Sequence, residues 1–82
     1  MPTVFRLGCL RVVVYPNDHR PAHVHVIGRG HEVIFELNRR QRSVVLRENF
    51  GFSRMELVKI RAALLANLNW LLAAWERMHG TA

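Results

Sequence analysis

The sequence has one cysteine, few acidic residues and no long uncharged apolar run. Cys9 stands alone among 82 residues, so the chain forms no internal disulfide and no cluster of zinc thiolates. No apolar run approaches the roughly 18 residues of a membrane span. Arg6 and Arg11 interrupt the first apolar stretch, and no small-residue cleavage site follows, which argues against a signal peptide. We therefore expect a cytoplasmic protein with no membrane partner.

Basic residues outnumber acidic ones by 12 to 6, giving a net charge of +6, and eleven of the twelve are arginine. A positive field steers polyanions toward a protein, and the guanidinium fork matches phosphate oxygens. The alternative explanation for the arginine content is a GC-rich genome, which encodes arginine where another genome encodes lysine. The charge favours nucleic acid or the ribosome as a partner.

The chain length predicts a single domain over residues 1–82. Apolar residues alternate with polar ones in the first half, within about residues 3–46, and tight turns are expected at Gly8 and over Gly28–Gly30. The pattern predicts a meander of four or five antiparallel strands. The expected strands are Thr3–Leu7, Leu10–Tyr15, Ala22–Ile27, Glu32–Leu37 and the short run Val44–Leu46.

The second half predicts one long C-terminal helix over about residues 53–79, packed on one face of the sheet. Ser53 and Glu56 form a capping-box pattern at its start, and Gly80 is a typical residue after a helix end. A straight helix of this length would measure roughly 40 Å, whereas a domain of this size is about 30 Å across. The helix must overhang or break, and Asn67–Asn69 is the expected break. The fold class is therefore α+β.

No charged residue occurs from Ala62 to Trp75, so the predicted helix is apolar on more than one face. Small residues allow close helix approach, and a helix that is apolar all round is normally buried. We expect an association surface here, most simply in a homodimer. The alternative is that alanine is only a good helix former and the tryptophan a tolerated surface aromatic. The expected interface residues are Ala66, Trp70, Ala73 and Ala74.

The segment with the clearest chemical potential is Asp18–His25. His23 and His25 are two apart on a strand, so both side chains project from one face, about 6–7 Å apart. The valines beside them point into the core, which predicts an accessible face for the histidines. Asp18 and His19, from the preceding loop, are placed to close over the pair.

One interpretation of this segment is acid–base catalysis. Histidine titrates near neutral pH, so His23 and His25 can supply one proton acceptor and one donor. Arg20 would hold a phosphate, and Asp18 or His19 would orient an imidazole. This set suffices for metal-independent RNA cleavage, in which a base takes the 2′-hydroxyl proton and an acid protonates the leaving oxygen.

A second interpretation is a three-ligand site for Zn²⁺ or a similar divalent ion, built from His23, His25 and Asp18 or His19, with one position open. A third is that the segment is structural, or binds phosphate without turnover. His31 and His79 are expected to be bystanders. A dense basic run follows the fourth strand and is suited either to a phosphate backbone or simply to solubility. Its residues are Arg39, Arg40, Arg42 and Arg47.

Several segments together resemble a bacterial family, the domain of unknown function numbered 4160. The most specific is the Asp-His-x-Pro-x-His-Val-His block, which falls on Asp18, His19, Pro21, His23 and His25. The chain departs from the family at Ala22, where a second proline is common. The other matching segments are Met1–Arg6, the remainder of Tyr15–Val26, Glu48–Ser53, Glu56-Leu57 and Trp75.

The resemblance implies a short bacterial protein whose gene often lies beside that of another small domain, as in toxin–antitoxin pairs. By analogy this chain would be the toxin-like member, acting on or binding nucleic acid. Its apolar helix would then bind the cognate small partner protein in place of a second copy. The alternative is a non-enzymatic binding module, with or without a metal at the histidines.

Overall fold

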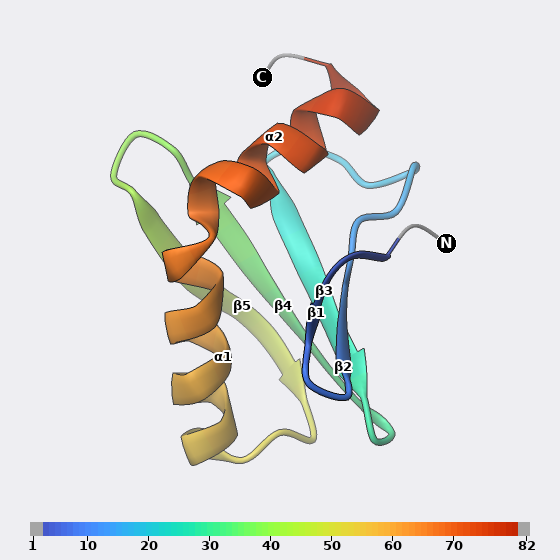
Figure 1. Cartoon of the computed structure of the whole chain (residues 1–82), viewed down its shortest axis with the longest axis vertical. Helices are drawn as coiled ribbons and strands as arrows, with labels where there is room; N and C mark the ends of the chain where they lie inside the picture. Colours follow the sequence, from blue (N-terminus) through green and yellow to red (C-terminus); the bar gives the residue numbers. More distant parts are fainter. Residues whose placement is uncertain (1–2, 81–82) are drawn as a thin grey trace.

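The computed structural model describes residues 3–80; Met1 and Pro2, which begin one of the family-like segments, lie outside them. Five strands form one antiparallel sheet in the order β1-β2-β3-β4-β5, and two helices follow. The predicted α+β class and the meander are confirmed (Figure 1). The strands are β1 Thr3–Leu7, β2 Leu10–Val13, β3 His23–Gly28, β4 His31–Asn38 and β5 Ser43–Phe50.

The fifth strand is longer than expected, because it continues past Leu46 to Phe50. Leu46 and Glu48 pair with neighbouring residues of β4, so Arg47 has no partner across the ladder and forms a bulge. A bulge shifts the alternation of side chains by one residue. The apolar pattern therefore breaks at Arg47, and the remainder of the strand resembles a polar connection in sequence.

The prediction of one long C-terminal helix is wrong, because the helix is broken into two. Helix α1 spans Arg54–Ala66 and α2 spans Leu68–His79, and their axes differ by 75°. The break falls at Asn67, inside the expected segment, where φ is −115° and ψ is 22°. The Asn67 side chain donates through Nδ2 to the carbonyl of Ala63 (2.8 Å). The molecule measures 33 Å along its longest axis, so the bend keeps the helices within the fold.

The helix start and end are as predicted. Ser53 Oγ accepts from the Glu56 backbone N–H at 3.2 Å, and Glu56 Oε1 accepts from the Ser53 backbone N–H at 2.8 Å. The capping box therefore satisfies two backbone donors of the first turn. At the other end, the Gly80 N–H donates to the Glu76 carbonyl at 2.7 Å.

One cluster of buried apolar side chains lies between the helices and the sheet. Helix α1 runs beside β5, and α2 turns across the upper end of the sheet toward β3 (Figure 1). The bend is thus what lets one chain segment cover both regions. The buried members of the cluster are Val12, Val14, Val24, Val26, Val33, Phe35, Leu37, Val44, Phe52, Ile60, Leu64, Leu68, Leu71, Leu72 and Trp75.

The expected association surface is only partly available. Trp70 is 48% exposed and its ring lies 5.8 Å from that of Phe5. Ala66 and Ala73 are exposed. Ala74 is 3% exposed and is buried in the core, which corrects its assignment to the surface. Ala74 lies three residues after Leu71 and one before Trp75, both of which are buried, so it falls on the buried face of α2.

Neither helix alone is long and apolar enough to cross a membrane in the part of the chain that the structure describes. The two helices pass that test together, by length and composition only, but they are bent sharply at Asn67.

Candidate metal centre

A tight turn positions the Asp18 carboxylate. The Asp18 N–H donates to the Tyr15 carbonyl at 3.1 Å, and the Tyr15 N–H donates to Asp18 Oδ2 at 3.0 Å. Pro16 fixes φ at the second position of this turn, and Asn17 follows it, as turn chemistry favours. One carboxylate oxygen is therefore held by the backbone, and Oδ1 remains to face the histidines.

The two histidines are covered, which corrects the prediction of an accessible face. His23 is 5% exposed, and the exposed fractions of the His23, His25 and Asp18 side chains are 7%, 12% and 12%. The cause is the loop between β2 and β3, which folds back over β3 and brings Asp18 with it. The adjacent Val24 is fully buried in the core, as predicted.

The three side chains converge on one point. Asp18 Oδ1 lies 3.4 Å from Nε2 of His23 and 3.4 Å from Nε2 of His25. One ligand atom from each residue lies within 4.8 Å of the other two. Nε2 of His25 is buried and has no hydrogen-bond partner within residues 3–80.

The other ring nitrogen of each histidine is already engaged. Nδ1 of His23 lies 2.9 Å from the carbonyl oxygen of Pro21, and Nδ1 of His25 lies 2.9 Å from Oε2 of Glu32. A carbonyl or carboxylate oxygen accepts, so each Nδ1 must carry the hydrogen and donate it. In a neutral imidazole, Nε2 then has a free lone pair, and both lone pairs face the Asp18 carboxylate.

Aromatic rings enclose the cluster. Tyr15 meets the His25 ring edge-on at 4.7 Å between centroids, and Trp75 lies 5.3 Å from the His23 ring. His79, expected to be a bystander, stacks on Trp75 at 3.9 Å, and its Nε2 lies 3.1 Å from the Tyr15 carbonyl. Helix α2 is thus tied to the loop that carries Asp18, and these rings lower the local exposure to water.

Two of the residues predicted for this site are not part of the cluster. His19 is exposed and does not belong to the group of possible ligands. Arg20 lines a separate pocket. Glu32 and the Pro21 carbonyl, which orient the two rings, were not predicted from the sequence. The register of the β3–β4 hairpin was the available signal for Glu32, because Glu32 lies diagonally across from His25.

The predicted nucleic-acid residues lie apart from the cluster, in the β4–β5 turn and on β5. Arg39 forms an ion pair with Glu76 of α2, and Arg42 Nη1 lies 3.5 Å from Asn69 Oδ1. Arg47 Nε lies 3.8 Å from Glu36 Oε2, and Arg40 is exposed.

The geometry of the cluster fits a divalent metal ion. Zinc holds nitrogen and oxygen ligands at about 2.0–2.2 Å, so two ligands of a tetrahedral site are about 3.4 Å apart. Both Nε2–Oδ1 distances are 3.4 Å. Histidines that bind metals usually donate the second ring N–H to a carboxylate or a backbone carbonyl, and here one does each. Three protein ligands would leave a fourth position of a tetrahedral ion for water or another molecule.

The fold and the cluster define the class: a small α+β protein with a His–His–Asp group held between the sheet, the β2–β3 loop and helix α2. The chain matches the family model described as Domain of unknown function (DUF4160) over residues 10–76, and it belongs to that family. The resemblance seen in the sequence is thereby confirmed. No curated protein and no solved structure matches the chain.

Proposed function

We propose that this protein binds a divalent metal ion, Zn²⁺ or a similar ion, through Asp18 Oδ1 and the Nε2 atoms of His23 and His25. The observation that carries the proposal is that both Nδ1 atoms are committed as donors while both Nε2 atoms face one carboxylate oxygen. Imidazole and carboxylate ligands together suit zinc and several other divalent transition metals. The ion would join the β2–β3 loop to β3.

The alternative without a metal is an ion pair between a protonated histidine and Asp18. Burial makes that arrangement costly unless the charges are well paired. The Nε2–Oδ1 contact of His25 is not a hydrogen bond, since that Nε2 has no hydrogen-bond partner within residues 3–80. A bound cation would satisfy the carboxylate and both nitrogens at once, which favours the metal.

The test is a calorimetric titration of tag-free protein with Zn²⁺, repeated with Co²⁺ to follow the visible absorption of the bound ion. We expect one equivalent to bind in wild type and binding to be lost in His25→Ala and Asp18→Asn. Asp18→Asn changes the charge but little of the shape, so the turn that holds it is retained. His19→Ala, in the same loop, is the matched control and should bind like wild type. The proposal would be refuted if His19→Ala lost Zn²⁺ binding as fully as His25→Ala does, or if wild type bound no Zn²⁺.

A second candidate is action on nucleic acid, which the exposed Arg40 and the neighbouring arginines of the β4–β5 turn favour. Acid–base catalysis by the two histidines without a metal needs one protonated and one unprotonated nitrogen facing the substrate. In their neutral forms both rings present an Nε2 acceptor to the Asp18 carboxylate, because both Nδ1 atoms donate, and one ring must gain a proton before the pair can supply an acid. A hydrolytic role through a bound metal needs no such proton, since the ion would activate water at an open position.

Cleavage of a labelled RNA pool separates these possibilities. Loss of cleavage both in EDTA and in His25→Ala indicates a metal-dependent nuclease. Cleavage that persists in EDTA but is lost in His25→Ala restores the metal-independent mechanism. Absence of cleavage by wild type rules out action on free RNA and leaves metal binding as the proposed function. The toxin-like role, the cognate partner and the cytoplasmic location stay predictions.

A further inference from the structure

Helix α1 carries a line of apolar side chains on the face that points away from the core. The helix buries Ile60 and Leu64, and with about 3.6 residues per turn the line falls on the opposite side of the helix. Figure 1 shows α1 at one side of the molecule, beside β5. We call this line the outer stripe, and all of its members are exposed. They are Met55, Val58, Ala62 and Leu65.

The outer stripe has the spacing of a seam between helices. Its members follow one another at intervals of three, four and three residues, which is the a and d pattern of a heptad. Met55 and Val58 are 69% and 63% exposed, so each stands largely in water. Single exposed apolar side chains are normal on a soluble protein, whereas a contiguous apolar patch marks an interaction site. The spacing favours another helix as the body that covers this patch.

The charge beside the outer stripe is of one sign. From the helical repeat, Arg54 and Arg61 lie along one side of the stripe and Lys59 lies along the other. The one acidic residue of α1 is Glu56, and it is paired with Arg29 of the β3–β4 turn. Arg54 and Lys59 form no ion pair within residues 3–80. The apolar line is therefore bordered by positive charge alone.

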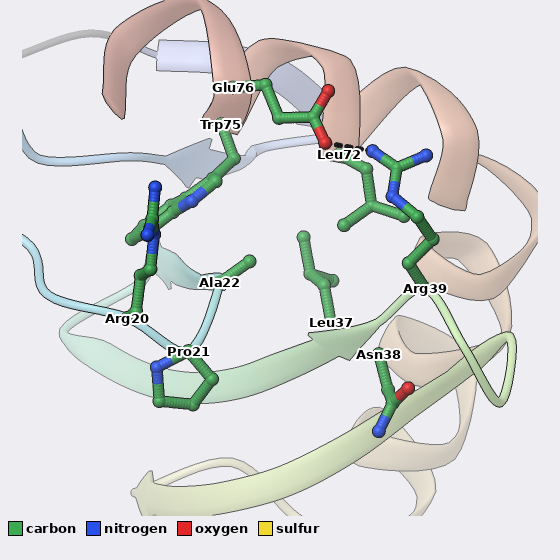
Figure 2. A pocket seen from close by; sticks show the side chains of 9 residues that line it. All are labelled: Arg20, Pro21, Ala22, Leu37, Asn38, Arg39, Leu72, Trp75 and Glu76. Atoms are coloured by element: carbon green, nitrogen blue, oxygen red, sulfur yellow. Dashed lines mark hydrogen bonds and ion pairs between the residues drawn. The ribbon is translucent and has the colours of Figure 1, made fainter. Parts of the chain in front are cut away.

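Helix α2 differs from α1 because its charged side chains already have partners. Glu76 pairs with Arg39 across the rim of a pocket beneath the helix (Figure 2). The Arg77 guanidinium lies over the exposed Trp70 ring, 5.8 Å from its centroid. Of the arginines and lysines on the two helices, those without an acidic or aromatic partner within residues 3–80 therefore all lie beside the outer stripe.

The charge also decides what kind of helix fits. Two copies of α1 packed along the outer stripe would set basic side chains against basic side chains, whether the helices ran parallel or antiparallel, because both sides of the stripe are basic. Like charges opposed across an interface disfavour association. A nucleic acid would match the charge but would leave Met55 and Val58 in water. A helix with acidic residues beside its own apolar seam matches both features, since opposite charges beside the seam set the choice of partner in helix pairs.

We propose that the outer stripe of α1 is a docking site for an amphipathic helix of another protein, one whose apolar seam is bordered by Glu or Asp. The partner would pack closely over Ala62, whose small side chain lets two helix axes approach. Its carboxylates would lie beside Arg54, Arg61 and Lys59. The stripe extends over about 15 Å of helix, so a partner of about three turns covers it. The proposal does not depend on the metal centre, because none of these residues belongs to it.

The test uses two synthetic peptides, because the partner is defined by its chemistry. Both peptides have Leu at the a and d positions over about three heptads. The acidic peptide has Glu at the e and g positions, and the basic peptide has Lys there. Fluorescence anisotropy of the labelled peptide, titrated with the full chain, gives the two affinities. We expect the acidic peptide to bind at least about ten-fold more tightly, and added salt to reduce this difference.

Variants of α1 test the apolar and the charged parts of the site separately. Val58→Ser removes an apolar contact without changing the charge, and it should weaken binding of the acidic peptide about ten-fold. Val45→Ser, the same substitution at a half-exposed position of β5, is the matched control and should bind like wild type. The double variant Arg54→Glu with Lys59→Glu should reverse the preference, so that the basic peptide binds more tightly than the acidic one.

Four results would overturn the proposal. The first is that wild type binds neither peptide or binds both equally. The second is an equal loss of affinity in Val58→Ser and Val45→Ser, and the third is a charge-reversed variant that keeps the preference of wild type. The fourth is tighter binding of wild type to phosphatidylserine vesicles or to single-stranded RNA than to the acidic peptide, with that binding lost in Val58→Ser. Circular dichroism confirms that each variant is folded, and Met55→Ser replaces Val58→Ser if that variant is not.

Discussion

Nε2 of His25 lies 3.4 Å from Oδ1 of Asp18, yet no hydrogen bond joins the two atoms. A buried polar atom normally has a partner, so this pair requires an explanation. A metal ion between them supplies one, because the same separation is that of two ligands on a tetrahedral ion. Nε2 of His23 lies at the same distance, 3.4 Å, from the same carboxylate oxygen.

Metal binding should stabilise the fold. At a free Zn²⁺ concentration of 100 times the dissociation constant, binding linkage raises the free energy of unfolding by about 2.7 kcal/mol. For a domain of this size, each kcal/mol raises the unfolding midpoint by about 4–8 °C, so we expect a rise of about 10–20 °C. The measurement is thermal unfolding by circular dichroism, with EDTA to reverse the effect. Asp18→Asn should show no rise, and a Zn²⁺ response in that variant equal to wild type would contradict the site.

The Glu32 carboxylate should influence metal affinity without binding the ion. Its bond to Nδ1 fixes the ring orientation of His25, and loss of such partners typically costs about 10–100-fold in affinity. Glu32→Gln keeps an acceptor oxygen but removes the charge. We therefore expect a loss of Zn²⁺ affinity at the lower end of this range, about ten-fold. Zn²⁺ titration measures it. Glu48→Gln on β5 is the control, and equal affinities for both variants would show that Glu32 does not orient the ligand.

The turns and the helix start could be predicted from the sequence because they depend on neighbouring residues. The Ser53–Glu56 capping box and the helix end at Gly80 follow from local patterns, and the structure has both. The β5 extension could not be predicted, because the bulge at Arg47 is defined only by pairing with β4. The bend at Asn67 was expected as one of two outcomes, since the sequence does not say what α2 packs against.

The arrangement of the candidate site could likewise be predicted only in part from the sequence. The alternation of β3 places His23 and His25 on one face, and the turn chemistry brings Asp18 near them. Their burial depends on Tyr15, from the loop that folds back over β3, and on Trp75, which approaches from a helix far along the chain. No local pattern predicts such contacts, so the sequence predicted an exposed pair.

The capping box should contribute measurably to stability. Ser53→Ala removes the acceptor for the Glu56 N–H, and the loss of an N-cap side chain costs about 1 kcal/mol. Urea unfolding monitored by circular dichroism gives the value. Ser53→Thr keeps the hydroxyl and should lose much less. A difference between the two variants of under about 0.3 kcal/mol would show that the cap is not energetically important.

Association through the helices remains a prediction that the exposed Trp70 allows us to test. We expect wild type to form a dimer in sedimentation equilibrium and Trp70→Glu to weaken it at least about ten-fold, since buried aromatic anchors dominate interfaces. Met55→Glu is the control, because Met55 is an exposed apolar residue of α1 on a different part of the surface. A monomeric wild type, or equal weakening by both variants, would contradict a self-association surface centred on Trp70.

The basic turn should give a salt-dependent affinity for RNA. For single strands, the logarithm of the affinity falls with that of the salt concentration by about 0.7 for each phosphate contact. Arg40→Ala and Arg42→Ala should each reduce this slope by about that amount in filter binding. Lys59→Ala, exposed on α1, should leave the slope unchanged. If Lys59→Ala reduced the slope equally, the attraction would reflect net charge alone.

The most direct test of the metal centre is nitrogen NMR of the histidine rings in tag-free protein, before and after one equivalent of Zn²⁺. The account predicts that His23 and His25 both carry hydrogen on Nδ1 in the metal-free protein, and that Zn²⁺ then shifts the Nε2 resonances of these two rings and leaves those of His19 unchanged. Hydrogen on Nε2 of either ring in the neutral, metal-free protein, or Nε2 resonances that do not respond to Zn²⁺, would contradict it.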